Sequence, residues 1–229
     1  MASIQNPEGL LHFTSGRLLY RAAESTDSDK EFIQKLLNDP TVQTMSTGRR
    51  KGPLFQKHAE EFIKLMQDAL LGVIICLPPS PGALSSSAGG KELKPVPIGH
   101  LGIFYTQPPG REHHRCAMLA ISLADGFRGK GYGGESINWA LDWAFQHVGL
   151  HRVSICAFAF NLSALKLYKK LGFVEEGRER EALYHLRTWH DLVMFGMLEH
   201  DLIHWVLLVI HSYPLDYLVR AQRQRAIKD

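Results

Sequence analysis

Cysteine is scarce in this sequence, with three residues in a chain of 229: Cys76, Cys116 and Cys156. Three cysteines are too few for the network of disulfides that stabilises small secreted domains, so that class of protein is excluded. Each cysteine lies in an apolar stretch typical of a β-strand, where a free thiol packs as a small hydrophobic side chain. We therefore expect all three thiols to be free.

Long hydrophobic runs are also missing. The longest, such as residues 205–210, have six residues, far fewer than the roughly 20 that span a bilayer as a helix. The first 13 residues have neither the basic start nor the apolar stretch of a secretory signal. These absences predict a soluble cytoplasmic protein that does not bind membranes.

Charge of one sign is not in large excess, since the formal net charge is +3 and 21% of the residues are charged. No stripe of aromatic and basic residues indicates a nucleic-acid surface, so we expect no nucleic-acid partner. Hydrophobic residues make up 45% of the chain, which excludes a wholly disordered protein. The length and composition together predict a single globular domain over residues 1–229.

Hydrophobic periodicity predicts the order of elements along the chain. Stretches typical of strands occupy residues 18–23, 71–77, 97–105, 116–123, 151–160, 173–184 and 192–198. Asp27 and Ser28 should cap a first helix that Pro40 ends, and further helices are expected over 56–71, from the glycine-rich residues 129–134 to 148, and over 161–171. Residues 78–95, rich in proline, glycine and serine, should form a flexible surface loop. This order indicates the α+β class with a mixed sheet.

The most informative stretch is residues 128–134, RGKGYGG, between an apolar strand and an amphipathic helix. Its four glycines allow backbone amides to turn toward a ligand without obstruction by side chains. The helix N-terminus adds unpaired N–H donors and partial positive charge, and Arg128 and Lys130 add full charges. The stretch therefore predicts a site for a phosphate or a pyrophosphate.

Two common phosphate-binding motifs do not fit this stretch. The Walker pattern G-x-x-x-x-G-K-[ST] is absent from the chain. Gly129, Gly131 and Gly134 satisfy the dinucleotide pattern G-x-G-x-x-G, but that site also needs an acidic residue about 20 positions further on. No Asp or Glu occurs between Trp143 and Val174, so the dinucleotide interpretation fails.

A third pattern does fit. Arg128-x-x-Gly131-x-Gly133 resembles the pyrophosphate loop of the GCN5-related N-acetyltransferase (GNAT) superfamily, whose pattern is [QR]-x-x-G-x-[GA]. Residues 161–173, NLSALKLYKKLGF, are similar to the family's second signature, N-x-x-A-x-x-L-Y-x-K-x-G-F. Residues 175–178 and 189–191 resemble the branch with the ribosomal-protein alanine and spermidine acetyltransferases. The resemblance covers about residues 18–198 and is firmest from residue 117 onward.

The resemblance implies a GNAT fold, with a mixed sheet of about seven strands, about four helices, and two strands that splay apart at the acetyl-CoA site. It implies acetyl-CoA as co-substrate and no metal. The backbone of the strand that ends Ile121-Ser122-Leu123 should bind the pantetheine arm and polarise the acetyl carbonyl. The implied coenzyme-binding residues are Ile121, Ser122, Leu123, Arg128, Gly129, Lys130, Gly131, Tyr132, Gly133, Gly134, Asn161, Ala164 and Tyr168.

By the same resemblance Tyr168 is the general acid, with its hydroxyl directed at the coenzyme sulfur. A phenol with a pKa near 10 is protonated at pH 7 and can donate to a departing thiolate. Packing in the core is the alternative role for this side chain. Glu181 is the predicted general base, although Glu179, Asp191 or a chain of water molecules would serve equally well. Asn161 should cap its helix and bond the coenzyme arm.

Paired histidines do not indicate a metal site. The pairs are His113/His114, His147/His151 and His200/His204. The segment 200–204, HDLIH, lacks the glutamate of H-E-x-x-H, and no third ligand accompanies it. We expect surface or capping histidines.

The chain continues beyond the region of resemblance. Residues 199–229 include many large apolar side chains, which would be unfavourable in water. This extension should cover the domain's own sheet or pack on another chain. We favour a homodimer in which it contributes to the interface.

The predicted activity is transfer of an acetyl group from acetyl-CoA to a primary amine by direct attack on the thioester. Residues 41–55 and the loop before Cys116 show neither the dense acidic cluster that suits a polyamine nor a peptide groove. The acceptor therefore stays open, with a slight preference for a small amine (polyamine, amino sugar or amino acid) over a protein N-terminus. A non-catalytic module that binds acyl-CoA is the alternative from another class, and the intact Tyr168 and Asn161 argue against it.

Overall fold

The computed structural model describes residues 13–79, 94–108 and 110–201. They contain one sheet of seven strands in the order β1-β2-β3-β4-β5-β7-β6. The strands are β1 (Leu19–Ala22), β2 (Leu71–Leu77), β3 (Val96–Tyr105), β4 (Cys116–Leu123), β5 (Arg152–Phe158), β6 (Val174–His185) and β7 (Thr188–Leu198). Neighbouring strands are antiparallel except β4 and β5, which are parallel. The α+β class and the mixed sheet are thus confirmed.

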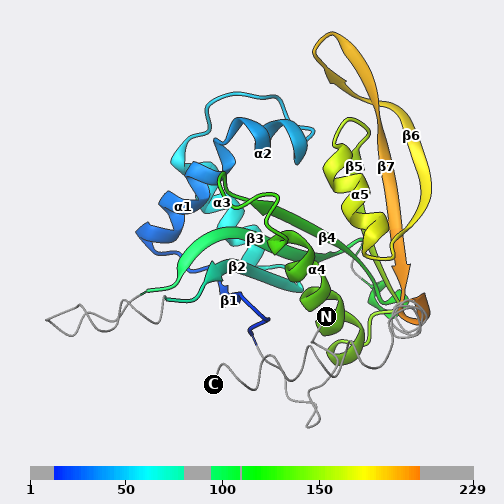
Figure 1. Ribbon diagram of the computed structural model, residues 1–229, viewed down its shortest axis with the longest axis horizontal. Helices are drawn as coiled ribbons and strands as arrows, with labels where there is room; N and C mark the ends of the chain where they lie inside the picture. Colours follow the sequence, from blue (N-terminus) through cyan, green and yellow to red (C-terminus); the bar gives the residue numbers. More distant parts are fainter. Residues whose placement is uncertain (1–12, 80–93, 109, 202–229) are drawn as a thin grey trace, which may run out of the picture.

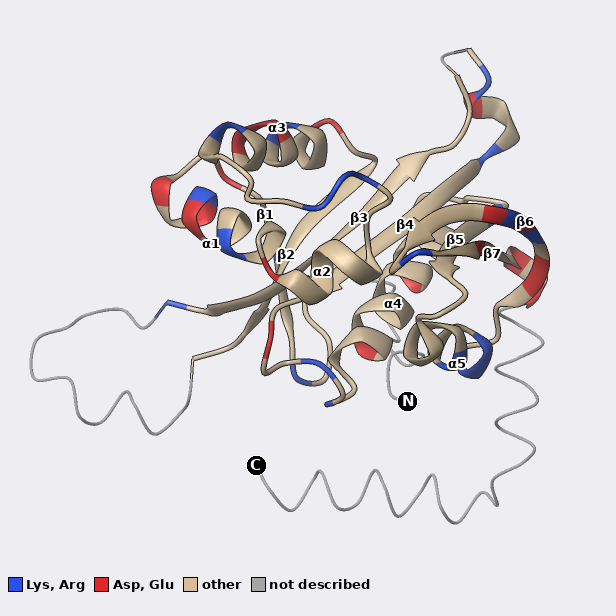
Figure 2. Cartoon of the chain, turned by 90° about the horizontal axis from the view of Figure 1, so that it is seen from above, with Lys and Arg blue, Asp and Glu red and all other residues tan. Residues whose placement is uncertain are grey.

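Helices cover both faces of this sheet. In the described part of the chain the α-helices are α1 (Asp27–Leu37), α2 (Pro40–Met45), α3 (Gln56–Gln67), α4 (Tyr132–Asp142) and α5 (Leu162–Lys170). Two short turns accompany them, η2 (Glu112–His114) and the π-turn η3 (Trp143–His147), which continues α4. Figure 2 shows α1 and α3 over one face and α4 and α5 over the other. We call these surfaces the α1–α3 face and the α4–α5 face.

Pro40 does not end the first helix, as the sequence had predicted, but begins another. α1 has already ended at Leu37, and the side chain of Asp39 accepts hydrogen bonds from the N–H groups of Thr41 and Val42 at 2.7 and 3.2 Å. Proline suits the first position of a helix because the N–H it lacks would have no partner there. The structure therefore has one α-helix, α2, more than the sequence indicated.

Two other helix ends differ from the prediction. Thr26, rather than Asp27 or Ser28, caps α1, by accepting a hydrogen bond from the N–H of Asp29 at 3.4 Å. The helix expected over 56–71 ends at Gln67, because the chain must turn before β2 begins at Leu71. These shifts move no element to another layer.

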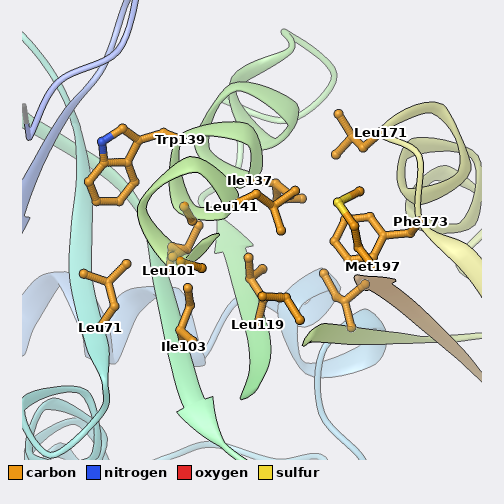
Figure 3. Packing of buried hydrophobic residues seen from close by; sticks show 14 of the residues in the cluster. Leu71, Leu101, Ile103, Leu119, Ile137, Trp139, Leu141, Leu171, Phe173 and Met197 are labelled. Carbon is orange, nitrogen blue, oxygen red and sulfur yellow. The ribbon is translucent and has the colours of Figure 1, made fainter. Parts of the chain in front are cut away.

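Each face of the sheet carries its own hydrophobic core. On the α4–α5 face, Leu101 and Leu119 of the central strands lie against Ile137 of α4 (Figure 3). At the edge of this cluster, Tyr20 of β1 stacks on Trp139 with ring centroids 3.8 Å apart. On the α1–α3 face a smaller cluster joins both helices to β2, and its buried members are Ala23, Ile33, Ala59, Ile63, Met66, Ile74 and Cys76. Full burial of each large apolar side chain contributes about 1.5–3 kcal/mol.

β4 and β5 part from each other along their length. Only three pairs join them, from Cys116 opposite Arg152 to Met118 opposite Ser154. Beyond these pairs, the remainder of β4 still pairs with β3, and the remainder of β5 still pairs with β7. The two carboxyl ends therefore diverge, and the splayed strands predicted from the family resemblance are confirmed.

β6 and β7 form a long hairpin that extends past the rest of the sheet (Figure 1). Its register shifts between Glu175 and Gly177 and again between Glu179 and Leu183, where β6 bulges. Bulges bend and twist a strand, so they redirect the hairpin away from the plane of the sheet. The outer part of the hairpin thereby meets the loop that follows α2, through Gly48 and Lys51.

Candidate active site

The glycine-rich loop joins the end of β4 to the start of α4. Gly129 and Gly131 have φ angles of +73° and +85°, which other residues rarely adopt, so these two positions need glycine. Gly131 is the N-cap of α4, and no side chain caps that helix end. The first N–H groups of the helix are therefore available to an anion, as the sequence predicted.

Arg17 lies against this loop, a contact that the sequence gave no reason to expect. Its guanidinium donates to the carbonyl of Lys130 at 3.1 Å, pairs with the Glu135 carboxylate at 2.8 Å and lies 4.6 Å from the centre of the Tyr132 ring. In a trans peptide the C=O and the following N–H point in opposite directions. The bond to the Lys130 carbonyl therefore directs the N–H of Gly131 away from Arg17.

Arg128 does not extend freely from the loop. Its Nε donates to the carbonyl of Leu123 at 2.9 Å, and its other guanidinium nitrogens face carboxylates, with Asp39 of the α2 cap as the close partner. Burial opposes ionisation of Asp39, but Arg128 and the N–H groups at the start of α2 together keep the pKa of that carboxyl below its usual value. Arg128 thus ties the loop to α2.

α2 spans the open end between β4 and β5. Its first end is held by the pair of Asp39 with Arg128, just after β4. Its last residue, Met45, accepts a hydrogen bond through its carbonyl from Nδ2 of Asn161, just after β5, at 3.4 Å. The two figures agree that α2 lies above the ends of these strands (Figures 1 and 2). The helix missed from the sequence is therefore a wall of the candidate site.

Asn161 caps α5, as the sequence predicted. Its Oδ1 accepts hydrogen bonds from the N–H of Ala164 at 3.2 Å and from the hydroxyl of Ser163 at 2.9 Å. With Oδ1 and Nδ2 both engaged, the side chain joins α5 to α2. Its bond to a coenzyme arm stays a prediction.

Tyr168 is buried on α5, at the α4–α5 face. Its ring lies 5.8 Å from that of Phe195 and 6.1 Å from that of Phe173, between centroids. The core packing considered as an alternative is thus present, and it leaves a role for the hydroxyl open. Burial, and to a smaller degree the neighbouring Cys156 thiol, raises the pKa of Tyr168 above its usual value, so the phenol is protonated at neutral pH.

The backbone of β4 borders the opening on one side. Residues 119–123 pair with β3 along one edge, with Ile121 opposite Leu101, Ser122 opposite His100 and Leu123 opposite Gly99. Their other edge has no strand partner in the described structure, because β5 has diverged. Free N–H and C=O groups at such an edge can bind an extended chain of amides.

Glu179 and Glu181 of β6 occupy different backbone settings. Glu181 sits within the bulge with a φ angle of +53°, and its N–H donates to Oδ1 of Asp191 at 3.1 Å. Glu179 pairs regularly with Leu192, which pairs with Phe158 of β5. Directly opposed residues share a face, so Glu179 lies on the α1–α3 face. The sequence could not separate the two, because the bulge changes which residues share a face.

Cysteines and histidines form no further centre in the described ranges. All three cysteines there are free thiols, as predicted. Within the same ranges, no three His, Cys, Asp or Glu side chains gather to hold a metal ion. His151 contacts Glu199 at 3.3 Å, and His204 lies outside the described residues. No helix in that part of the chain is long and apolar enough to cross a membrane.

The splayed sheet and the uncapped helix behind a glycine-rich loop are the features that the resemblance to the acetyltransferases implied. Residues 17–174 match the family model described as the acetyltransferase (GNAT) domain. The match spans more than half of the chain, and the protein belongs to the GNAT acetyltransferase family.

Curated relatives match over shorter stretches. The chain is 33% identical over 88 residues to the putative ribosomal N-acetyltransferase YdaF of Bacillus subtilis, a match that covers 38% of this chain and 48% of the relative. It is 34% identical over 86 residues to a spermidine N(1)-acetyltransferase of Vibrio cholerae, covering 38% and 50%. The chain thus spans about half the length of the curated relatives it matches.

Solved structures agree over a larger part of the chain. The spermidine N-acetyltransferase of Vibrio cholerae in complex with CoA and spermine has a TM-score of 0.64 at 22% identity, covering 82% of this chain and 98% of that one. A GNAT acetyltransferase from Bacillus anthracis has a TM-score of 0.63 at 18% identity, covering 83% and 99%. At these identities the likeness shows the fold alone.

Proposed function

We propose that the protein is an acetyl-CoA-dependent N-acetyltransferase that transfers the acetyl group to a primary amine of a small molecule. One observation carries the proposal: the glycine-rich loop and the diverging ends of β4 and β5 lie at the same end of the sheet, beneath α2. A coenzyme with its pyrophosphate on the loop would extend its arm between the strands. The acceptor would then approach from the α1–α3 face, beside α2.

The residues present fit acetyl-CoA as co-substrate. A Cβ placed on Gly129 would meet no described atom within 4 Å, so a phosphate can approach the loop backbone closely. The uncapped N–H groups of α4 supply donors and partial positive charge. The free edge of β4 offers N–H and C=O groups to the amides of pantetheine. Bound acetyl-CoA supplies the activated thioester.

The transfer needs a deprotonated amine, a polarised carbonyl and a proton for the leaving thiolate. The amine nitrogen attacks the thioester carbon, and the C–S bond breaks as the thiolate departs. Backbone N–H groups at the β4 edge would stabilise the oxyanion. Tyr168 would donate a hydrogen bond to the departing sulfur, which its neutral phenol supports. Glu179 or Glu181, directly or through water, would receive the proton of the amine.

Two other functions stay as alternatives. A protein N-terminal α-amine would also react at such a site, and the small amine is the first choice because residues 41–55 and the loop before Cys116 show no sequence pattern of a peptide groove. A non-catalytic module that binds acyl-CoA would use the same fold, and the hydroxyl of Tyr168 would then have no role in a reaction. The variant Tyr168→Phe separates the last case: a transferase should lose about 100-fold or more in kcat, and a binder should lose nothing.

The decisive experiment measures release of free CoA thiol from acetyl-CoA with a panel of polyamines, hexosamines, amino acids and short peptides. Release with a small amine, lost in Tyr168→Phe while acetyl-CoA still raises the melting temperature, is the expected result. Release only with peptides would replace the small acceptor by a protein N-terminus. If acetyl-CoA neither reacts nor stabilises the protein, the proposed function is wrong.

A homodimer in the cytoplasm remains part of the proposal. The spermidine N-acetyltransferase of Vibrio cholerae, a structure of similar fold, is described as dodecameric. It gives a precedent for assembly within this fold. The predicted interface segment 199–229 lies outside the described residues from 202 onward. Sedimentation of the full chain, compared with a chain that ends at residue 201, tests whether the segment contributes.

A further inference from the structure

The loop between α2 and α3, residues 46–55, is held by two buried or half-buried amide side chains. Gln43 donates to the carbonyl of Gly52 at 2.9 Å and accepts from its N–H at 3.0 Å. Asn38 bonds both backbone groups of Leu54 in the same way, at 3.1 and 2.8 Å. Such paired bonds fix the returning half of the loop, so its outer residues have a defined place.

The outer residues of this loop meet the β6–β7 hairpin. Gly48 lies beside Leu183, since a Cβ at Gly48 would be 3.9 Å from the Leu183 side chain. Nζ of Lys51 contacts Nδ1 of His185 at 2.5 Å. Leu183 pairs with His190 across the hairpin and shares its face, which is that of Glu179 and Leu192. The loop therefore covers the outer part of the α1–α3 face of the hairpin.

Aromatic rings continue this contact inward. Phe160 stacks on His185 with centroids 5.0 Å apart and meets His190 edge-on at 4.9 Å. Phe160 directly precedes Asn161, which holds the end of α2. A continuous lining thus runs from the opening between β4 and β5, past Phe160, to Lys51.

The loop contributes three consecutive cations, Arg49, Arg50 and Lys51, all exposed. In the described part of the chain, no carboxylate forms an ion pair with any of them. Two carboxylates of β6 on the same face lie further in: Glu176, which pairs with Arg152, and Glu179, at the Leu192 position. The lining therefore has an acidic group without an ion-pair partner, Glu179, near the strands, and cations without an ion-pair partner at its outer end, among the described residues.

We propose that the acceptor amine carries an anionic group, a carboxylate or a phosphate, which the cations of residues 49–51 bind. This rests on the proposed function, because it names the substrate class of that same site. The polarity of the lining orients such a molecule, with its amine toward Glu179 and its anion toward Lys51. Lys51 contacts His185, whose ring lies 6.3 Å from that of His190, and His190 lies about 7 Å along β7 from Leu192. A spacer of several bonds between the two groups therefore suits the site.

A polyamine fits this lining poorly. A second ammonium group would lie beside Arg50 and Lys51, where like charges repel. A neutral amine would gain nothing from the cations. The cations of residues 49–51 therefore favour acceptors whose second group is negatively charged, although that group lies far from the reacting nitrogen. Charged groups at such a distance contribute more to specificity than to affinity.

The test uses acceptors of one length that differ in terminal charge: 5-aminopentanoate, 5-aminopentanamide and 1,5-diaminopentane, with 4-aminobutyl phosphate as the phosphate counterpart. We expect kcat/KM for the better anion to exceed that for the neutral amide about tenfold, and the preference to shrink at high salt. The ratio between the carboxylate and the phosphate identifies the anion.

The variants Arg50→Gln and Lys51→Gln should each reduce the preference for the anion and leave kcat/KM for the neutral amide unchanged. Lys64→Gln on α3 removes the same charge from a distant exposed site and is the matched control. Equal use of the three acceptors, or preference for the diamine, would overturn the inference while leaving an acetyltransferase in place. No acetylation of any amine in either panel would overturn the proposed function as well.

Discussion

The guanidinium of Arg128 pairs with the carboxylate of Asp39, although the two residues are 89 positions apart in the chain. One partner belongs to the glycine-rich loop and the other caps α2. The pair therefore connects the part of the molecule that should hold the coenzyme with the helix that borders the acceptor side. A single ion pair links the two halves of the proposed reaction.

Replacement of Asp39 should weaken both halves. Asp39→Ala removes the cap of α2 and the ion pair, and we expect it to lower the free energy of unfolding by about 2 kcal/mol and to raise the KM values for acetyl-CoA and for the acceptor. Asp39→Asn is the matched control because asparagine still caps a helix but carries no charge. Chemical denaturation and steady-state kinetics measure the two effects. Equal losses in the two variants would assign the effect to the charge, whereas no loss in Asp39→Asn would mean that the charge adds nothing to the link.

Arg17 should act on the coenzyme by fixing the loop. Because it holds the Lys130 carbonyl and Glu135, its loss frees the peptide that directs the Gly131 N–H. We expect Arg17→Ala to raise the KM for acetyl-CoA about tenfold with little change in kcat. Arg17→Lys keeps the charge but cannot hold both partners, so it should resemble alanine if position matters. Recovery of the normal KM in the lysine variant would indicate a purely electrostatic role.

Glu179 and Glu181 provide a matched pair for the general base. The register places Glu179 on the acceptor side and Glu181 in a bulge, so Glu179→Gln should reduce kcat/KM about 100-fold and Glu181→Gln only slightly. The acidic limb of the pH–rate profile should disappear in the variant that lacks the base. A large loss in Glu181→Gln alone would identify Glu181, the residue predicted from the sequence, as the base. Loss in neither would favour a water chain.

His100 should make the fold sensitive to acid. Burial on β3 lowers its pKa to about 4, whereas an unfolded chain has the ordinary value of about 6.5. Between these values the unfolded chain binds the extra proton, so stability is complete above pH 6.5 and falls as the pH drops toward 4. From pH 7.5 to 4.5 the loss from this residue should be about 2.5 kcal/mol.

His100→Phe removes this titration and retains a ring beside Phe62, whose centroid lies 4.8 Å from that of His100. Denaturant unfolding at several pH values should show a shallower acid dependence in the variant than in the unchanged protein. The carboxylates titrate alike in both chains, so the difference isolates His100. Parallel curves would mean that the imidazole charges without cost in the folded state.

Much of the fold followed from local sequence. Strands with continuous apolar runs, such as residues 71–77 and 116–123, were predicted at their observed bounds. A strand that is buried on both faces consists almost entirely of apolar residues, so its composition indicates where it lies. The glycine-rich loop and the Asn161 cap were recognised for a similar reason. Both depend on backbone groups within a few residues, so a short segment of sequence is enough to predict them.

The sequence could not foresee what depends on distant segments. Pro40 resembles a helix terminator as well as a helix start, and α2 is placed by its ties to Arg128 and Asn161. A regular strand would put Glu179 and Glu181 on one face, because strand side chains alternate with a period of two, and the bulge of β6 breaks this relation.

The sequence by itself therefore determined the family and the order of the strands and helices apart from α2, and it predicts an anion site at the loop. The tertiary structure alone decided that Arg17 supports that loop from 113 residues away, that α2 spans the splayed strands, and that Lys51 stands against His185. The physical reason is the distance along the chain over which each kind of interaction acts. Propensity and capping act within a few residues, whereas the walls of a site are made by ion pairs and hydrogen bonds whose partners meet only after the sheet has formed.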